Sequence, residues 1–390
     1  MIPRQIAPQI LAQVGKYSVI IVSGPRQSGK TTLIRSLFPD FPYFSLENPD
    51  VQQRIEQDPR GLFQQYGHRM VLDEVQRLPI ILSYIQGIVD DDRRACFVLS
   101  GSQNLLMMES VSQTLAGRAT LFYLQPLSYG ELRGHVPDGV TSTELMWRGG
   151  YPRIYDRNVA AERFYQDYLA TYVQRDVRQV KNIGDLGAFT RFLGICAGFI
   201  GQTINKSTLA SAAGVNTATA ASWLSVLETS FVTYQLQPYF KNFKKRLVKS
   251  PKLYFRDTGL ACALLGITSP ESLFTYYQRG AIFENFIINE VAKGFFNRGT
   301  QPPLYFWRDS NQHEIDLLIN LGNSLRPVEI KSGATYRRDF FKQLDWFAGV
   351  ADVPLRQPTV VYGGTEYQQH TTGELLSWRN AATVAKIAEG

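Results

Sequence analysis

The sequence predicts an α/β protein whose first part is a parallel sheet built around a phosphate-binding loop. In the stretch VIIVSGPRQSGKTTL, the apolar residues 19–22 form a strand directly before a glycine-rich turn, and no helix breaker follows until Pro39. Further along, a short apolar run ends in Asp73 and Glu74, which is typical of a neighbouring strand in the same sheet. An ordinary glycine turn between a strand and a helix is the alternative interpretation of the first stretch.

Composition restricts the class of protein. The 390 residues are enough for several domains, and 44% hydrophobic with 19% charged residues is typical of a soluble globular chain. No apolar run reaches the roughly 18 residues of a membrane span. The N-terminal stretch MIPRQIAPQI is too interrupted for a signal peptide. Three scattered cysteines indicate buried thiols in a reducing compartment, so we expect a cytoplasmic protein without a membrane partner.

The glycine-rich turn has the residue types that bind a triphosphate. Its glycines allow backbone N–H groups to close around phosphate oxygens, and the following helix directs its free N–H groups at the same place. We expect Lys30 to reach the β- and γ-phosphates and Thr31 to hold Mg²⁺. The predicted ATP contacts are Gly24, Pro25, Arg26, Gln27, Ser28, Gly29, Lys30, Thr31 and Thr32.

The acidic pair that ends the run 70–74 completes this chemistry. Asp73 is placed to hold Mg²⁺ through water, and Glu74 to polarise the attacking water. Phosphoryl transfer depends on positioning and charge neutralisation, so a few such groups suffice.

Two further features could belong to the same site. The strand 95–99 is followed by Ser102, Gln103 and Asn104, any of which could sense the γ-phosphate or could simply cap the next helix. Arg118 precedes the strand 120–124, where it could be a finger that reaches a phosphate in cis or in trans, or an exposed arginine in a salt bridge.

Four segments together resemble a prokaryotic AAA-superfamily ATPase family over nearly the whole chain: GPRQSGKTTL, VLDEVQ, VLSGSQNLL and LAGRATLFYLQPLSYGEL. The resemblance implies an ATP-hydrolysing Mg²⁺ site, a possible homo-oligomer, and a C-terminal half with a winged helix and a nuclease-like fold. We expect an ATPase core at 1–145, a helical lid at 146–200, a winged helix at 201–270 and a nuclease-like domain at 271–390.

The stretch 207–232 has the helix, glycine turn and second helix of a helix-turn-helix. Asn216 is the expected N-cap of the second helix, with Trp223, Leu224 and Leu227 facing inward. Small polar residues near its start favour contacts with DNA, and the alternative is a helical hairpin used for packing or as the lid of the ATPase.

The stretch 239–256 is strongly basic and contains no acidic residue. Interleaved aromatic residues and a basic turn between two strands would form a wing that attracts DNA phosphates, whereas a solvated basic hairpin is the alternative. The predicted DNA contacts are Lys241, Lys244, Lys245, Arg246, Lys249 and Lys252.

The stretch 280–362 resembles the restriction-endonuclease-like core in its order of a helix, three strands, a helix and a strand. Asp316 with Glu329 and Lys331 is similar to the PD-(D/E)XK signature without its leading proline, and Glu284 is where that superfamily often has another acid. The carboxylates would share Mg²⁺ while Lys331 orients or deprotonates water. The alternative is a retained fold whose acids form salt bridges.

These features predict an ATP-hydrolysing, DNA-binding protein of DNA processing, repair or defence that contacts the backbone of structured or branched DNA. Two alternatives are a nucleotide-switched regulator without nuclease activity and a protein remodeller whose basic wing meets acidic partners.

Overall fold

The computed structural model describes residues 1–102, 114–172, 185–239 and 250–386. The chain divides into two compact units, each considered by itself below. The first contains 1–126, 229–231 and 296–300, and the second contains the remainder.

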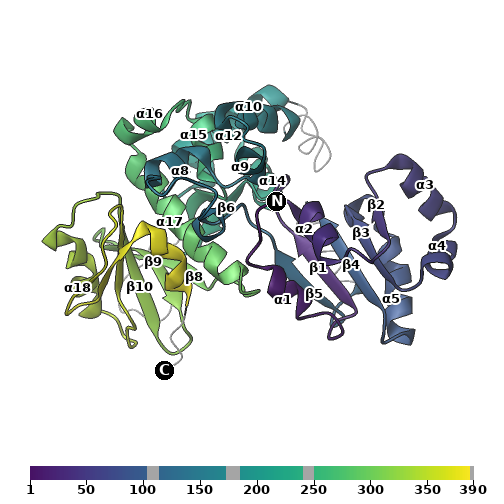
Figure 1. The fold of residues 1–390 in the computed structure, drawn as a ribbon. Coiled ribbons are helices and arrows are strands. Elements are labelled where there is room, and N and C mark those ends of the chain that lie inside the picture. Colours follow the sequence, from purple (N-terminus) through teal and green to yellow (C-terminus); the bar gives the residue numbers. More distant parts are fainter. Residues whose placement is uncertain (103–113, 173–184, 240–249, 387–390) are drawn as a thin grey trace. The chain divides into compact units, whose positions relative to one another are not determined.

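The sheet of the first unit has the strand order β2-β3-β4-β1-β5, and each neighbouring pair is parallel (Figure 1). Parallel strands bring their carboxyl ends to one edge, so the loops after β1, β3 and β4 meet there. The strands are β1 Val19–Ser23, β2 Tyr43–Ser45, β3 Arg69–Asp73, β4 Cys96–Gly101 and β5 Ala119–Tyr123.

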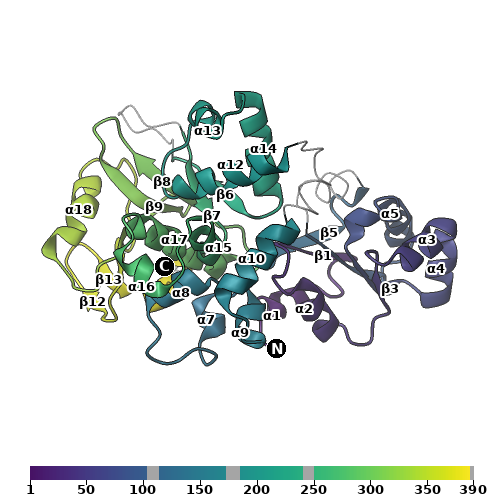
Figure 2. The same ribbon diagram turned by 90° about the horizontal axis from the view of Figure 1, so that it is seen from above.

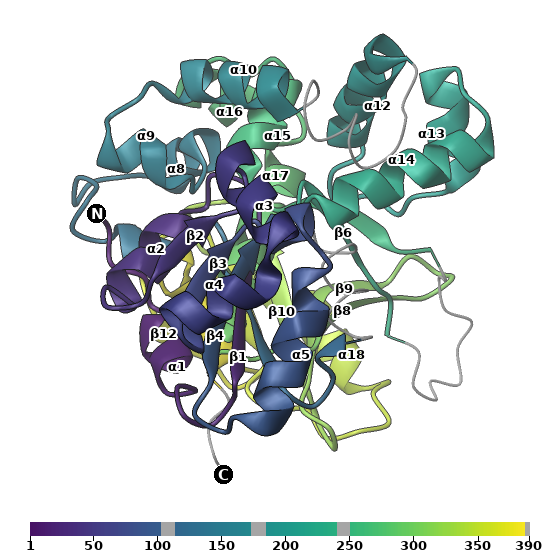
Figure 3. The ribbon, with the colours of Figure 1, turned by 90° about the vertical axis from the view of Figure 1, so that its right-hand side faces the viewer.

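Helices cover both faces of this sheet, as its nearly continuous apolar strands require (Figure 3). Val19 and Ile21 pack on the face shared with α3, α4 and α5, whereas Ile20 and Val22 pack on the face shared with α1 and α2. The helices are α1 Ala7–Leu11, α2 Lys30–Leu37, α3 Pro49–Gln57, α4 Pro59–Tyr66, η1 Val75–Arg77 and α5 Ile81–Asp91.

The second unit begins with short helices and then contains the expected helix, glycine turn and helix (Figure 2). Gly214 ends α13 in a left-handed conformation, and the Asn216 side chain caps α14 by accepting a bond from the Thr219 N–H at 2.7 Å. The antiparallel pair β6–β7 follows directly. These elements are α7 Tyr129–Leu132, α8 Ser142–Arg148, α9 Pro152–Asp156, α10 Ala161–Thr171, α12 Leu186–Gly198, α13 Lys206–Ala213, α14 Thr217–Thr229, β6 Thr233–Leu236, β7 Lys252–Phe255, α15 Thr258–Leu264 and α16 Pro270–Thr275.

The long helix α17 leads into a mixed sheet with the order β12-β13-β11-β10-β9-β8. Strands β8, β9 and β10 are antiparallel neighbours, and the crossover through α18 makes β11 parallel to β10. These elements are α17 Arg279–Phe296, β8 Leu304–Arg308, β9 Glu314–Asn320, β10 Leu325–Lys331, η3 Arg338–Phe341, α18 Lys342–Ala348, β11 Thr359–Tyr362, β12 Gln368–Gln369, β13 Glu374–Ser377 and η4 Trp378–Ala385.

The structure confirms the expected strands in the N-terminal and C-terminal parts of the chain. It also contains β12 and β13, which were not predicted. The three cysteines are buried free thiols. Among the described residues, no helix combines the length and apolar character that crossing a membrane requires.

Candidate functional site

The loop between β1 and α2 has the backbone shape of a phosphate cradle. Gly24, Gln27 and Gly29 have positive φ angles of 146°, 59° and 94°, and turns with such residues are typical of anion-binding concavities. A side chain on Gly24 would overlap the carbonyl oxygen of Leu124, so only glycine fits there. Gly29 is also the N-cap of α2, so that the helix begins where the loop ends.

Lys30 is buried, and its ammonium lies inside this loop. Its Nζ donates to the carbonyl oxygens of Gly24 and Pro25, both at 2.8 Å. Ser28 is fully buried, yet its hydroxyl has no hydrogen-bond partner among the described residues. A buried orphan hydroxyl in a glycine-rich loop fits an oxyanion ligand, so the residues present suit a bound triphosphate.

Asp73 links the strands behind this loop. Its Oδ2 accepts bonds from the hydroxyls of Thr31 and Tyr43, each at 2.6 Å. Its Oδ1 accepts from the Ser100 hydroxyl and, at 3.1 Å, from the backbone N–H of Glu74. Burial and the bond to Asp73 raise the pKa of the Tyr43 hydroxyl, which therefore remains a donor. The structure thus brings Thr31 and Asp73 together at the position predicted for Mg²⁺.

Glu74 follows in a left-handed conformation, with a φ of 57°. One of its carboxylate oxygens accepts from the Gln76 amide and, at 3.2 Å, from the Ser102 hydroxyl. Ser102 therefore contacts the predicted water-polarising residue, whereas Gln103 and Asn104 lie outside the described residues.

Three supporting residues of this site were not predicted. Tyr43 and Ser100 orient Asp73, and Ser100 could have been found because it begins the polar run that follows the apolar strand 95–99. Arg4 is nine per cent exposed and donates to the carbonyl oxygens of Ser28 at 2.7 Å and Gln125 at 2.6 Å, which ties the loop to the N-terminal segment. Nothing in the sequence near Arg4 indicates this long-range contact.

The prediction that Arg118 reaches the phosphate of its own chain is wrong. Arg118 precedes the first residue of β5, at the amino edge of the sheet, whereas the phosphate loop follows the carboxyl end of β1. Its guanidinium instead forms two bonds with Asp90, at 2.5 and 2.9 Å, which raise the pKa of Arg118. The exposed salt bridge is therefore the correct interpretation within one chain.

Most of the predicted DNA contacts lie outside the described residues, namely Lys241, Lys244, Lys245, Arg246 and Lys249. The prediction for Lys252 is wrong, because its side chain is only 3% exposed and its ammonium pairs with the carboxylates of Glu284 and Glu314. A cation enclosed in this way by acids cannot contact a phosphate backbone where it lies. The described helix α14 contains no lysine or arginine.

The second unit brings three carboxylates together. Ligand oxygens of Glu284, Glu314 and Asp316 all lie within 4.8 Å of one another. Glu314 was not predicted, although it is two residues from Asp316 on the same strand and therefore shares its face. Burial raises the pKa of Asp316 well above its usual range, and the negative charges of Glu329 and Glu284 add to the effect.

Glu329 lies beside this cluster on β10, next to β9. Lys331 Nζ bonds one of its oxygens at 2.6 Å, so the two residues share a face as the spacing predicted. The other oxygen, Oε2, is buried and has no hydrogen-bond partner among the described residues. Burial raises the pKa of Glu329 even though Lys331 opposes this shift. An orphan oxygen beside three carboxylates is a donor set that suits Mg²⁺.

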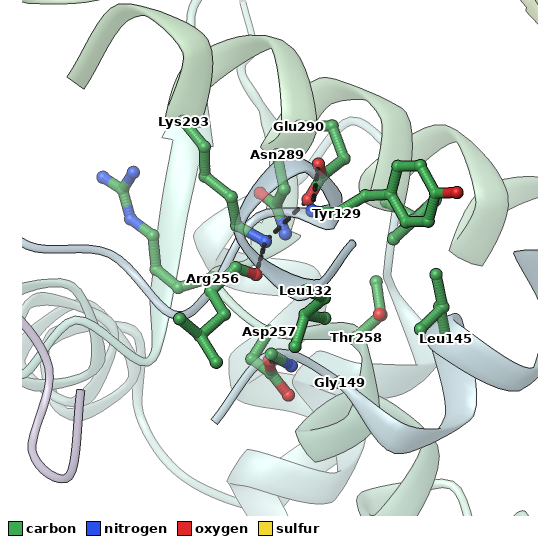
Figure 4. Close-up of a pocket in the computed structure, with 13 residues that line it drawn as sticks. Tyr129, Leu132, Leu145, Gly149, Arg256, Asp257, Thr258, Asn289, Glu290 and Lys293 are labelled. Atoms are coloured by element: carbon green, nitrogen blue, oxygen red, sulfur yellow. Dashed lines mark hydrogen bonds and ion pairs between the residues drawn. The ribbon is translucent and has the colours of Figure 1, made fainter. Parts of the chain in front are cut away.

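A separate pocket of the second unit is lined by polar groups, several of which bond one another (Figure 4). Glu290 accepts from the Tyr129 N–H at 2.8 Å and pairs with Lys293 at 2.8 Å. Asp257 caps α15 and accepts from the Tyr165 hydroxyl at 2.6 Å. These contacts tie Tyr129 to α17 and α10 to the start of α15, which indicates a structural role.

Three family models match the chain. An AAA domain matches residues 16–133, and two domains of unknown function, DUF8612 and DUF4143, match 139–271 and 279–380. A solved structure, the Walker-type ATPase PABY2304 of Pyrococcus abyssi, is 14% identical with a TM-score of 0.47 and covers 68% of this chain and 96% of its own.

Two relatives are similar to this protein over most of the chain. The uncharacterized proteins Rv2008c of Mycobacterium tuberculosis and Mb2031c of Mycobacterium bovis are each 30% identical over 367 residues, covering 93% of this chain and 80% of theirs. The AAA match contains the loop of Lys30 and the acidic pair Asp73–Glu74. The chain therefore belongs to the same family as these mycobacterial proteins, and its first unit is an AAA-type P-loop ATPase domain.

Proposed function

We propose that this protein hydrolyses ATP with Mg²⁺ in its first unit and that nucleotide turnover controls a DNA-acting, nuclease-like second unit. The approach of Thr31 and Asp73 to 2.6 Å carries the first half of the proposal. These residues come from the loop after β1 and the end of β3, and in a P-loop enzyme both serve one metal ion.

Each residue has a role that its position supports. Lys30 would exchange loop carbonyls for the β- and γ-phosphate oxygens, because its ammonium already lies within the cradle. Thr31 and Asp73 would hold Mg²⁺, which supplies positive charge to the phosphates when bound. Glu74 would orient water, with Ser102 fixing its carboxylate.

Measurement of ATP turnover in Lys30→Ala tests this half. We expect hydrolysis to fall by at least about 100-fold with loss of ATP affinity, since Lys30 is the charge that meets the transferred phosphate. Lys16→Ala, an exposed lysine of the same unit, is the control and keeps full activity. Unchanged ATP affinity in Lys30→Ala contradicts the proposal.

Support for the second half comes from the order of elements. The run α12, α13, α14, β6 and β7, with bridges from residues 200 and 203 to β7, is consistent with a winged helix. The sheet β8–β11 behind α17 has the strand directions expected for a restriction-endonuclease-like core. Glu284, Glu314, Asp316 and Glu329 would hold Mg²⁺, which would supply Lewis-acid charge to a phosphodiester.

Cleavage of duplex, flapped and four-way DNA with Mg²⁺ tests the nuclease activity. We expect Lys331→Ala to abolish cutting, because Lys331 is the cation on the face of Glu329, while the exposed Lys342→Ala cuts normally. If wild type and Lys331→Ala behave alike on every substrate, the nuclease assignment is wrong.

DNA binding by the segment 239–256 is tested through salt. Neutralising Lys244, Lys245 and Arg246 together should reduce the magnitude of the slope of log affinity against log salt by up to about 2.7. An unchanged slope places the DNA contacts elsewhere.

A second candidate is a nucleotide-switched regulator or protein remodeller whose acids are structural. The enclosure of Lys252 by Glu284 and Glu314 favours it, because charges already paired do not need a metal. Stimulation of ATP hydrolysis by DNA would count against this candidate.

Native mass measurement with and without ATP would test the proposed homo-oligomer and whether Arg118 could act in trans.

A further inference from the structure

The ammonium of Lys252 lies among the carboxylates of the second unit. Lys252 is the first residue of β7, and its Nζ is 2.8 Å from a Glu284 oxygen and in contact with Glu314. The same Glu284 oxygen accepts a bond from the Tyr254 hydroxyl. The Phe306 ring centroid lies 5.5 Å from Nζ. The ammonium is therefore held by both charge and packing.

Glu284 and Glu314 are also members of the cluster that suits a divalent cation. Their ligand oxygens and that of Asp316 lie within 4.8 Å of one another. An ammonium is a compact point charge that bonds carboxylate oxygens much as a metal ion does. Two cations bound to the same oxygens would repel each other strongly at low dielectric. Lys252 and a metal therefore compete for the same ligands.

The third acid of the cluster, Asp316, and the neighbouring Glu329 have other partners than Lys252, and Glu329 pairs with Lys331 at 2.6 Å. Asp316 accepts a bond from the backbone N–H of Ile330 at 2.8 Å, and Glu329 Oε2 is buried without a partner among the described residues. Burial raises the pKa of Lys252's neighbour Asp316 well above its usual range. Burial alone would lower the pKa of Lys252, but Glu284 and Glu314 outweigh it and raise that pKa, so the ammonium stays charged.

We propose that Lys252 is a built-in competitor of the divalent cation at the Glu284–Glu314–Asp316 cluster, so that metal binds only when the ammonium leaves Glu284 and Glu314. This inference rests on the proposed metal site of the second unit. The four-carbon stem allows the ammonium to move without rearrangement of β7. The cluster is in this way closed to metal in the arrangement described.

Titration with Mn²⁺ in the absence of nucleotide tests the competition, read by the paramagnetic resonance of free Mn²⁺. We expect Lys252→Met to bind Mn²⁺ at least about tenfold more tightly than wild type, which corresponds to about 1.4 kcal/mol. Lys252→Arg keeps the positive charge and should bind as weakly as wild type. Lys342→Met is the exposed control and should leave the affinity unchanged. Any metal held near Asp73 is common to all these proteins and cancels.

Two further measurements keep the outcome clear. If Lys252→Met folds poorly alone because its acids are uncompensated, Mn²⁺ should restore its circular dichroism and melting temperature more than it changes those of wild type. Adding Glu284→Gln to Lys252→Met should remove the gain in affinity.

Equal or weaker Mn²⁺ binding by Lys252→Met overturns the competition. If, in the same series, wild type still binds and Glu329→Gln reduces that binding, the proposed metal site survives. If no variant binds Mn²⁺, the metal site itself is wrong and the inference fails with it.

Discussion

The carboxylate of Asp73 in the first unit and the carboxylates of the Glu284–Glu314–Asp316 cluster in the second unit are stabilised by different kinds of partner. The described hydrogen-bond partners of Asp73 are neutral hydroxyls and a backbone N–H. In the cluster, Glu284 and Glu314 instead pair with Lys252, and Glu314 also pairs with Arg308 at 3.4 Å. Neutral donors orient a carboxylate and leave its negative charge for a cation, whereas a lysine neutralises that charge.

This difference changes what a metal ion must do at each place. At Asp73 the ion would add to an oriented but uncompensated carboxylate, so the bonds to Tyr43 and Ser100 could persist. At the cluster the ion would exchange with an ammonium. Under the proposed function, the first unit would therefore bind nucleotide and metal directly, whereas the second would bind metal only after Lys252 has left Glu284 and Glu314.

The largest effect should come from Glu74→Gln, which would sharpen the description of the first unit as ready for chemistry. We expect ATP hydrolysis to fall by about 10²–10⁴-fold while ATP binding is kept, because a neutral amide cannot polarise water. Equilibrium ATP binding and single-turnover hydrolysis separate the two effects. Full turnover would show that Glu74 has another role.

Asparagine at two positions should have opposite effects on stability. Asp73→Asn loses acceptors for buried donors and should destabilise the first unit by about 1–3 kcal/mol. Asp316→Asn keeps an oxygen for the Ile330 N–H and removes a repelled charge, so it should stabilise the second unit at neutral pH. Hydrogen exchange reports each unit separately. Equal signs for the two variants would break the comparison.

A smaller effect than those of the asparagine variants is expected on the pH dependence of stability, and it should be specific to the second unit. Because Asp316 and Glu329 have raised pKa values, the folded state binds protons that the unfolded state releases. The stability that this proton binding gives the folded state is fully present below the pKa of the unfolded state, which is about 4. It is lost as the pH rises through the pKa values of the folded state. The melting temperature of the double variant Asp316→Asn, Glu329→Gln, measured relative to that of wild type, should therefore rise as the pH increases toward neutrality. The exposed Asp352→Asn should show no such trend.

The smallest effect should follow from Arg118→Ala. Its bonds to Asp90 are on the surface, where ion pairs contribute little, so the melting temperature and the ATP hydrolysis of an isolated chain should hardly change. Asp90→Asn is the matched control, because it breaks the same ion pair and keeps the arginine. If only Arg118→Ala lowers hydrolysis in an assembled form, the arginine acts in trans.

Much of the architecture followed from the sequence, because strand periodicity and turn residues are local signals. The phosphate loop and the strand ending at Asp73 occur where they were predicted, and the stretch 280–362 has the predicted order of a helix, three strands, a helix and a strand. Lys252 was misread because a run of basic residues does not reveal which of them packs inside. Glu314 could have been included from its spacing to Asp316.

The supporting contacts were harder to predict because they join residues distant in the chain. Tyr43 meets Asp73 only because β2 lies beside β3, and sequence periodicity does not give strand order. Arg118 followed the family pattern in sequence, yet strand direction places it at the far edge of its own sheet. Tertiary pairing, which a local pattern cannot encode, decided both outcomes.

The bond between Arg4 and the Ser28 carbonyl has a practical consequence for work with shortened chains. A fragment cut at the borders of the AAA match would start at residue 16 and would lack this anchor, as well as Gln5, whose amide oxygen accepts from Asn297 at 3.2 Å. Such a fragment would retain the whole glycine-rich motif and still bind nucleotide poorly. Activity lost on trimming would then reflect a loosened loop, and restoring the first fifteen residues together with 296–300 is the remedy to try first.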